Sequence, residues 1–185
     1  MWTIPNILTV MRIALIPVFI LAFYLPDFSW KHILTTSIFF FAGISDWFDG
    51  YLARKLDQQS AFGAFLDPVA DKLMVSTALV LLLVRYPGFW IAMASIVIIG
   101  REIAVSALRE WMAEAGSKTK VSVSILGKIK TMAQMFAIGM LIFHQDLWDI
   151  PITELGYILL FFAAFLTLWS MYLYLKAAWP SLTKS

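Results

Sequence analysis

The sequence predicts an all-α membrane protein, and two observations support this fold class. The chain has 185 residues, of which 61% are hydrophobic, and its mean hydropathy is +0.82. Soluble domains are only about 45–50% apolar. The chain also contains apolar windows of about 20 residues, the length that an α-helix needs to cross a bilayer. Because only short polar segments separate these windows, we expect a single integral-membrane catalytic domain over residues 1–185.

Six apolar windows follow one another along the chain, and each ends at polar, Pro or Gly residues. The first ends at PDFSWKH, the third at RYPG, the fourth at EAGSKTKVS and the fifth at HQDLWDIP. The third window opens at Pro68, which suits a first helical position, and Asp67 before it could be the N-cap. The expected transmembrane helices are 6–25, 32–53, 68–86, 89–109, 127–145 and 154–177.

The basic residues predict the orientation of these helices. Six spans put both termini on one side, and that side would carry twelve of the 14 Lys and Arg residues, leaving Lys31 and Arg85 on the other. Cytoplasmic segments are enriched in Lys and Arg, so we expect both termini in the cytoplasm. The N-terminus lacks the features of a cleaved signal peptide, and we expect it to be retained.

The composition also excludes several classes of function. The chain has no cysteine, so it offers no thiolate nucleophile or thiolate metal ligand. Its net charge is only +2, and no basic tract is interleaved with aromatic residues, so we expect no nucleic-acid partner.

Four aspartates lie near the cytoplasmic ends of the second and third expected helices. Asp46 and Asp49 share one stripe of the second helix, while Asp67 and Asp71 are four residues apart on the third. Because the two helices are antiparallel neighbours, the four carboxylates can converge. Clustered carboxylates repel one another unless cations neutralise them, and all-oxygen ligands favour Mg²⁺ or Mn²⁺. Two such ions suit phosphoryl transfer. The alternative is that the aspartates are solvated helix ends paired with nearby basic residues, namely Arg54, Lys55 and Lys72.

The spacing around these aspartates carries a resemblance. The residues read Asp46-x2-Asp49-Gly50-x2-Ala53-Arg54-x8-Gly63-x3-Asp67-x3-Asp71. This pattern resembles the signature of the CDP-alcohol phosphatidyltransferase family without a departure. The resemblance implies a six-helix, dimeric membrane enzyme with a cytoplasmic site for two metal ions. It also implies that a CDP-linked lipid transfers its phosphatidyl group to an alcohol and releases CMP.

The same resemblance implies roles for individual residues. Asp46, Asp49, Asp67 and Asp71 would be the metal ligands, and Asp71 would also be the general base. The segment IPNILTVMR resembles the family's N-terminal segment near the nucleotide site. Its alternative interpretation is that Asn6 caps a helix and Arg12 is a snorkelling interface residue. The residues expected to bind CDP-diacylglycerol are Asn6, Thr9, Gly50, Ala53, Arg54, Ser60 and Gly63.

A second polar cluster bears on the acceptor alcohol. Arg101, Arg109, Lys128 and Lys130 lie at the cytoplasmic ends of the fourth and fifth expected helices. These cations would suit an acceptor that carries its own phosphate. Alternatively, they only set the topology, or they pair with the neighbouring acids Glu102, Glu110 and Glu114. For Lys118 and Lys120, too, the alternative is that they only set the topology. REIAVSALREW and GKIKTMAQM are similar to the bacterial branch of the family whose acceptor is sn-glycerol 3-phosphate.

These resemblances imply a bacterial inner-membrane enzyme of phospholipid synthesis that makes phosphatidylglycerol phosphate. Within the family, the alternatives are cardiolipin synthesis from CDP-diacylglycerol, with phosphatidylglycerol as acceptor, and the synthesis of phosphatidylserine or an inositol phosphate lipid. A divalent-cation transporter is the alternative from another class. Transporter sites lie near the bilayer midplane within structural repeats, whereas these acids lie at helix ends and no repeat is visible.

Overall fold

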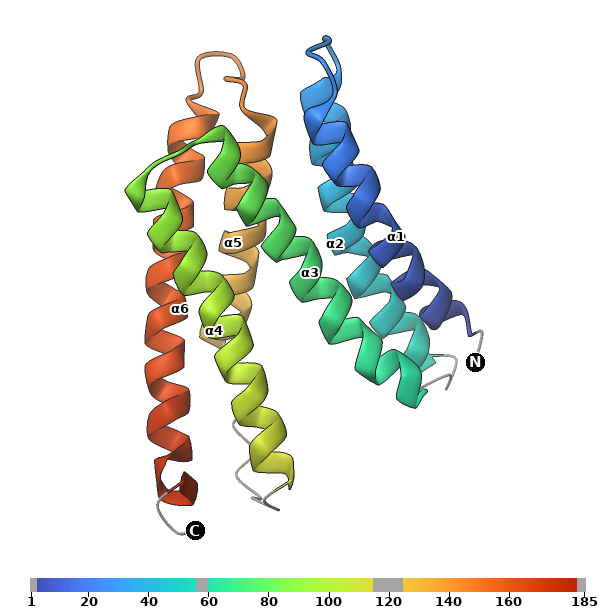
Figure 1. Ribbon diagram of the computed structural model, residues 1–185, viewed down its shortest axis with the longest axis vertical. Helices are drawn as coiled ribbons and strands as arrows, with labels where there is room; N and C mark the ends of the chain where they lie inside the picture. Colours follow the sequence, from blue (N-terminus) through green and yellow to red (C-terminus); the bar gives the residue numbers. More distant parts are fainter. Residues whose placement is uncertain (1–2, 56–59, 115–124, 183–185) are drawn as a thin grey trace.

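The computed structural model consists of six helices, which confirms the predicted all-α class. It describes residues 3–55, 60–114 and 125–182, and no strand occurs within these ranges. The helices run alternately up and down, so the α1–α2, α3–α4 and α5–α6 turns lie at one end and both termini at the other (Figure 1). Their bounds are α1 Ile4–Tyr24, α2 Lys31–Lys55, α3 Ala61–Arg85, α4 Phe89–Glu114, α5 Ile125–Phe143 and α6 Ile152–Leu182.

Helix α3 begins earlier than the sequence predicted. Ser60 is its N-cap, because the Ser60 Oγ accepts a hydrogen bond from the Gly63 backbone N–H at 3.0 Å. The prediction that Asp67 caps this helix and Pro68 opens it is therefore wrong. Pro68 lies inside α3, where its missing N–H removes one backbone hydrogen bond. Since the helix is continuous, Gly63, Asp67 and Asp71 recur every four residues along one side of it.

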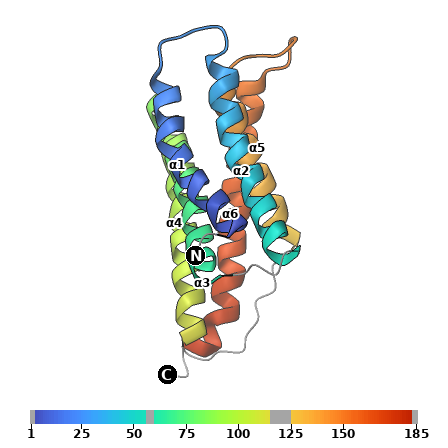
Figure 2. The same cartoon turned by 90° about the vertical axis from the view of Figure 1, so that its right-hand side faces the viewer.

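The helices pack in two groups that α3 connects. Helix α1 packs on α2 and α3, while α6 packs on α4 and α5. Figure 1 shows α3 running obliquely from the terminal end of α1 and α2 towards α4 and α6, and Figure 2 shows α2 beside α5. Small residues bring α2 and α5 close: a Cβ at Gly43 would lie 2.5 Å from Met135, and a Cβ at Gly139 would strike the Phe40 ring. The fully buried apolar core includes Phe19, Phe39, Leu79, Leu82, Ile98, Ile138 and Leu141.

Within the described residues, three helices are long and apolar enough to cross a membrane, which supports the prediction of a membrane protein. These segments are Pro5–Tyr24, Phe89–Met112 and Ile152–Lys176. Large apolar side chains such as Leu21 (69% exposed) and Trp90 (70% exposed) face outward, as expected where lipid replaces water. Helices α2 and α3 carry the aspartates at the terminal end, which lowers their hydropathy. The crossing of all six helices stays a prediction.

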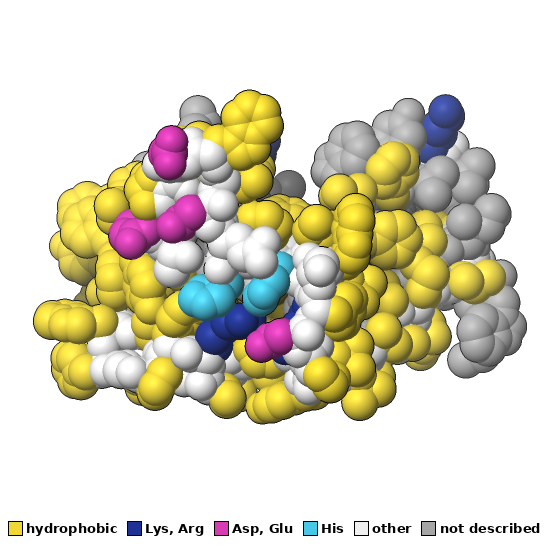
Figure 3. All heavy atoms as spheres, turned by 90° about the horizontal axis from the view of Figure 1, so that it is seen from above, with side chains coloured by type: hydrophobic (Ala, Val, Ile, Leu, Met, Phe, Trp, Pro, Cys, Tyr) yellow, Lys and Arg dark blue, Asp and Glu magenta, His cyan; other side chains and the backbone are white. Residues whose placement is uncertain are grey.

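The end opposite the termini gathers the chain's two histidines, as Figure 3 shows. The ring centroids of His32 and His144 are 6.2 Å apart, and the Tyr86 hydroxyl forms a hydrogen bond with the His144 ring. Lys31 donates a hydrogen bond to Asp27 at 2.9 Å. This hydrogen bond and the Lys31 charge hold the pKa of the Asp27 carboxyl below its usual value. None of the residues in the aspartate signature lies at this end.

Candidate active site

Helix α1 presents three buried polar side chains on one face. Asn6, Thr9 and Arg12 recur every three residues and are 2%, 0% and 1% exposed. Polar groups in such a position are costly unless they are hydrogen-bonded. Each of the three has a partner on α2 or at the start of α3, as the following contacts show.

The partners of these α1 side chains belong to the aspartate region. Arg12 Nη1 donates to Asp46 Oδ1 at 2.6 Å, and Thr9 Oγ1 donates to Asp67 Oδ1 at 2.6 Å. The Ser60 hydroxyl donates to Asn6 Oδ1 at 2.9 Å while it caps α3. Helix α1 therefore fixes the orientation of two of the aspartates and of the N-cap.

Gly63 is required where α1 and α3 meet. A Cβ at this position would lie 2.6 Å from Asn6 Oδ1 and 3.2 Å from Ser60 Oγ. Real Cβ atoms do not approach a polar atom so closely, so a larger residue would displace the Asn6 side chain. The glycine thus allows the contact between Asn6 and Ser60.

Asp71 lies on the wall of a cavity between α3, α4, α5 and α6. The cavity has a volume of about 240 Å³, which suits a ligand smaller than a drug-sized molecule. Arg101 and Glu102 of α4, Lys130 and Gln134 of α5, and Ser170 of α6 also line it. Two carboxylates and three cations, Lys72 among them, therefore border the same space.

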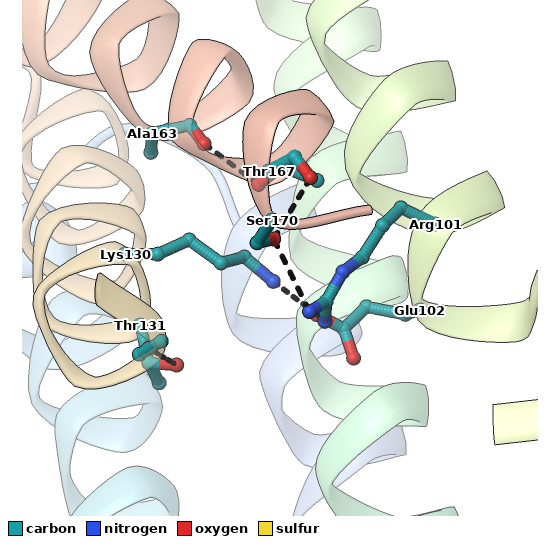
Figure 4. Close-up of polar contacts among 8 residues, drawn as sticks. Arg101, Glu102, Lys130, Thr131, Ala163, Thr167 and Ser170 are labelled. Carbon is teal, nitrogen blue, oxygen red and sulfur yellow. Dashed lines mark hydrogen bonds and ion pairs between the residues drawn. The ribbon is translucent and has the colours of Figure 1, made fainter. Parts of the chain in front are cut away.

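Two of the cavity's cations, Arg101 and Lys130, are held by a shared carboxylate (Figure 4). Lys130, which is 2% exposed, donates to Glu102 Oε1, and Arg101 Nη1 donates to the same oxygen at 3.2 Å. Arg101 Nη2 also donates to Ser170 Oγ at 3.3 Å. The Ser170 hydroxyl donates its own proton to the Thr167 carbonyl at 2.9 Å, so towards Arg101 it acts as an acceptor. With Lys72 and Asp71 counted, three cations and two carboxylates line the cavity. The cavity therefore carries a net positive charge, which favours an anionic ligand.

The structure thus places the sequence-predicted residues in two neighbouring groups. Asn6, Thr9, Asp46, Ser60, Gly63 and Asp67 form the first, and Asp71, Arg101 and Lys130 border the cavity. Lys128 is exposed and does not line the cavity. Lys118 and Lys120 lie outside the described residues, as do the surroundings of Asp49, Gly50, Ala53, Arg54 and Arg109.

Two alternative interpretations of the N-terminal segment are wrong. Asn6 is not the helix cap, because Thr3 is the N-cap of α1. Arg12 is not a snorkelling residue, because its side chain is 1% exposed and pairs with Asp46.

Sequence reasoning missed two residues of the cavity. The alternative that the basic cluster pairs with Glu102 is confirmed for Arg101 and Lys130, which both bind this carboxylate. Gln134 and Ser170 are buried polar residues in apolar helices, and this was the only signal that could have marked them. Periodicity does not show which neighbouring helix such a residue faces.

The comparison with known families decides the family of the chain. A family model described as CDP-alcohol phosphatidyltransferase matches residues 2–169. The chain belongs to the CDP-alcohol phosphatidyltransferase family.

Members of this family with a curated name match nearly the whole chain. A protein of Pectobacterium atrosepticum is 52% identical over 178 residues, covering 96% of this chain and 95% of its own. One of Pseudomonas fluorescens is 52% identical over 180 residues, covering 97% and 91%. One of Yersinia pestis is 51% identical over 179 residues, covering 97% and 96%. All three are named CDP-diacylglycerol--glycerol-3-phosphate 3-phosphatidyltransferase.

CDP-alcohol phosphatidyltransferases use a divalent metal ion, and the donor chemistry of this chain fits one. Carboxylate oxygens are the ligands that such hard cations prefer. Asp46 and Asp67 are each oriented by a hydrogen bond from α1, as carboxylates that bind metals are. Among the side chains that the structure describes, no three His, Asp or Glu residues come close enough to hold an ion together. Asp49 is outside that set.

Proposed function

We propose that the protein transfers the phosphatidyl group of CDP-diacylglycerol to sn-glycerol 3-phosphate, giving phosphatidylglycerol phosphate and CMP. The names of the relatives support this acceptor. The observation that carries the proposal is the cavity in which Asp71 faces the same space as Arg101 and Lys130. A phosphorylated alcohol needs both a base for its hydroxyl and cations for its phosphate.

The acceptor binds through its phosphate in this proposal. Arg101 and Lys130 give charge-assisted hydrogen bonds to the phosphate oxygens, and an arginine can do so with two N–H groups at once. Burial of an unpaired phosphate at the membrane boundary would be costly, so a cationic pocket is a condition for binding. Arg109 and Lys128 remain proposed phosphate contacts on the same side of the membrane.

Asp71 acts as the general base in the transfer step. The acceptor hydroxyl oxygen attacks the phosphorus that carries the diacylglycerol group, and its proton passes to the Asp71 carboxylate. A new P–O bond forms, the P–O bond to CMP breaks, and CMP leaves with the electron pair. Arg101 and Lys130 position the acceptor for this attack.

The donor CDP-diacylglycerol binds on the side of α1 and α2. We assign its contacts to the seven residues singled out in the sequence, which are Asn6, Thr9, Gly50, Ala53, Arg54, Ser60 and Gly63. Asp46, Asp49, Asp67 and Asp71 would hold two Mg²⁺ or Mn²⁺ ions. When bound, the ions neutralise the diphosphate and stabilise CMP as the leaving group.

We also propose where the protein lies in the cell and in which oligomeric state it acts. The chain is one catalytic domain that crosses the bacterial inner membrane six times, with both termini and the active site in the cytoplasm. The supporting observation is the bias of basic residues towards the terminal end. By its family resemblance the enzyme is a homodimer.

An acceptor screen tests the proposed function. The purified protein, with Mg²⁺ or Mn²⁺ and CDP-diacylglycerol, should release CMP when sn-glycerol 3-phosphate is added, and Asp71→Asn should abolish this release. Glycerol and phosphatidylglycerol should give little product. Faster transfer to phosphatidylglycerol would assign the chain to cardiolipin synthesis, and no CMP release with any alcohol would reject the transferase proposal.

A further inference from the structure

The acceptor cavity contains a buried side chain whose hydrogen-bonding capacity is not used. Gln134 is 4% exposed, lines the cavity, and has a carboxamide oxygen without a hydrogen-bond partner among the described residues. A buried polar atom left in this state costs about 1–3 kcal/mol. Such atoms are rare in native proteins and call for an explanation such as a ligand.

Several other polar groups around Gln134 have partners inside the protein, whereas Arg101 Nε, a donor, has none among the described residues. Lys130 is bound to Glu102, and the Thr131 hydroxyl donates to the Gly127 carbonyl at 3.0 Å. Ser170 accepts from Arg101 and donates to Thr167. Among the described residues of this wall, Gln134 is therefore the side chain whose buried acceptor, the carboxamide oxygen, has no hydrogen-bond partner.

The position of Gln134 relates it to the proposed acceptor. It lies four residues after Lys130 on α5, so the two side chains share a face and are about 6 Å apart along the helix axis. This distance is comparable to the length of a three-carbon phosphate. The phosphate is assigned to Arg101 and Lys130, and the reacting hydroxyl to Asp71. The remaining polar group of glycerol 3-phosphate is its second hydroxyl.

We infer that Gln134 binds the non-reacting hydroxyl of the acceptor and so determines specificity for a polyol phosphate. A hydroxyl can donate to the carboxamide oxygen or accept from its amino group, so either orientation of the amide serves. An acceptor without this hydroxyl leaves the amide unpaired, and a site built to bind a hydroxyl rejects such an analogue. This inference rests on the proposed function.

Two acceptors that differ by one hydroxyl test the inference. 3-Hydroxypropyl phosphate keeps the phosphate and a primary hydroxyl of sn-glycerol 3-phosphate but lacks the second hydroxyl. The wild-type enzyme should prefer glycerol 3-phosphate by about 10–100-fold in kcat/KM. In Gln134→Met, which keeps the length of the side chain, the preference should fall to about twofold or less, because only the reaction of glycerol 3-phosphate is impaired.

Two further variants separate recognition from folding. Gln134→Glu keeps an acceptor oxygen and should keep the preference for glycerol 3-phosphate. Its negative charge weakens the binding of both phosphorylated acceptors alike. Thr131→Val removes a cavity hydroxyl that already has a partner and should also leave the preference unchanged. A wild type that uses both acceptors equally, or a Gln134→Met variant with the wild-type preference, would overturn the inference while the proposed function stands. A wild type that uses neither acceptor would overturn both.

Discussion

At the residue scale, Gly63 shows how closely the site is packed. Its Cα faces the Asn6 carboxamide and the Ser60 hydroxyl, and a Cβ would lie only 2.6 Å from the Asn6 oxygen. Both of these neighbours are proposed donor-binding residues that hydrogen-bond to each other. The glycine in the family signature therefore has a steric explanation in this chain.

The substitution Gly63→Ala should impair binding of the donor. The new methyl group displaces Asn6 and weakens its bond to Ser60, so we expect KM for CDP-diacylglycerol to rise and stability to fall by about 1–3 kcal/mol. Steady-state kinetics and thermal unfolding in detergent measure these two effects. Gly100→Ala is the matched control, because a Cβ at Gly100 meets nothing within 4 Å. Equal behaviour of the two variants would show that the close approach has no role.

At the element scale, α1 acts as a support for the aspartates. Its buried polar face donates one hydrogen bond to Asp67 and one to Asp46. Contacts of this kind orient metal ligands, and their loss typically weakens metal affinity about 10–100-fold. The support comes from a helix that carries none of the proposed ligands.

The variant Thr9→Val should therefore weaken metal binding by about 10–100-fold. Valine keeps the shape of threonine but cannot donate to Asp67. Titration of Mn²⁺ followed by electron paramagnetic resonance measures the affinity without turnover. Thr35→Val serves as control, because Thr35 is also buried but its hydroxyl donates to the Lys31 carbonyl at 2.8 Å, at the opposite end of α2. An unchanged Mn²⁺ affinity in Thr9→Val would remove α1 from the metal site.

The sequence predicted the elements better than their contacts. Apolar windows located the six helices, since a membrane-spanning helix must be continuously apolar. They failed at the start of α3, because the Ser60 cap precedes a stretch that contains Asp67 and the helix-disfavouring Pro68. The partnerships of Thr9 and Arg12 with two aspartates, and the burial of Gln134, depend on how the helices pack. No periodicity within one helix contains that information.

At the scale of the whole molecule, the up-and-down arrangement gives the bundle two ends, which we propose lie on opposite sides of the membrane. The aspartates lie in the last part of α2 and the first part of α3, and Lys130 lies in the first part of α5, so all belong to the end with the termini. Arg101 of α4 lines the same cavity as Lys130. The histidines and the α5–α6 turn lie at the other end (Figures 1 and 3). A nucleotide-linked donor and a phosphorylated acceptor would both come from the cytoplasm. The terminal end should therefore be cytoplasmic.

Labelling of single cysteines tests this topology, and the absence of native cysteine makes each introduced one unique. Phe28→Cys and Leu147→Cys should react in intact cells with a reagent that cannot cross the membrane. Lys118→Cys should react only after the cells are opened. The reverse pattern would invert the topology and place the active site outside the cell.

In the proposed mechanism, one cavity joins the proposed base Asp71 to a phosphate site made by Arg101 and Lys130. The most direct test is the separate determination of both KM values in Arg101→Gln and Lys130→Met. Loss of one charge-assisted hydrogen bond, about 1.5–3 kcal/mol, should raise KM for sn-glycerol 3-phosphate about 10–150-fold. KM for CDP-diacylglycerol should change little. A rise confined to KM for CDP-diacylglycerol would contradict the account, because the two cations would then bind the donor.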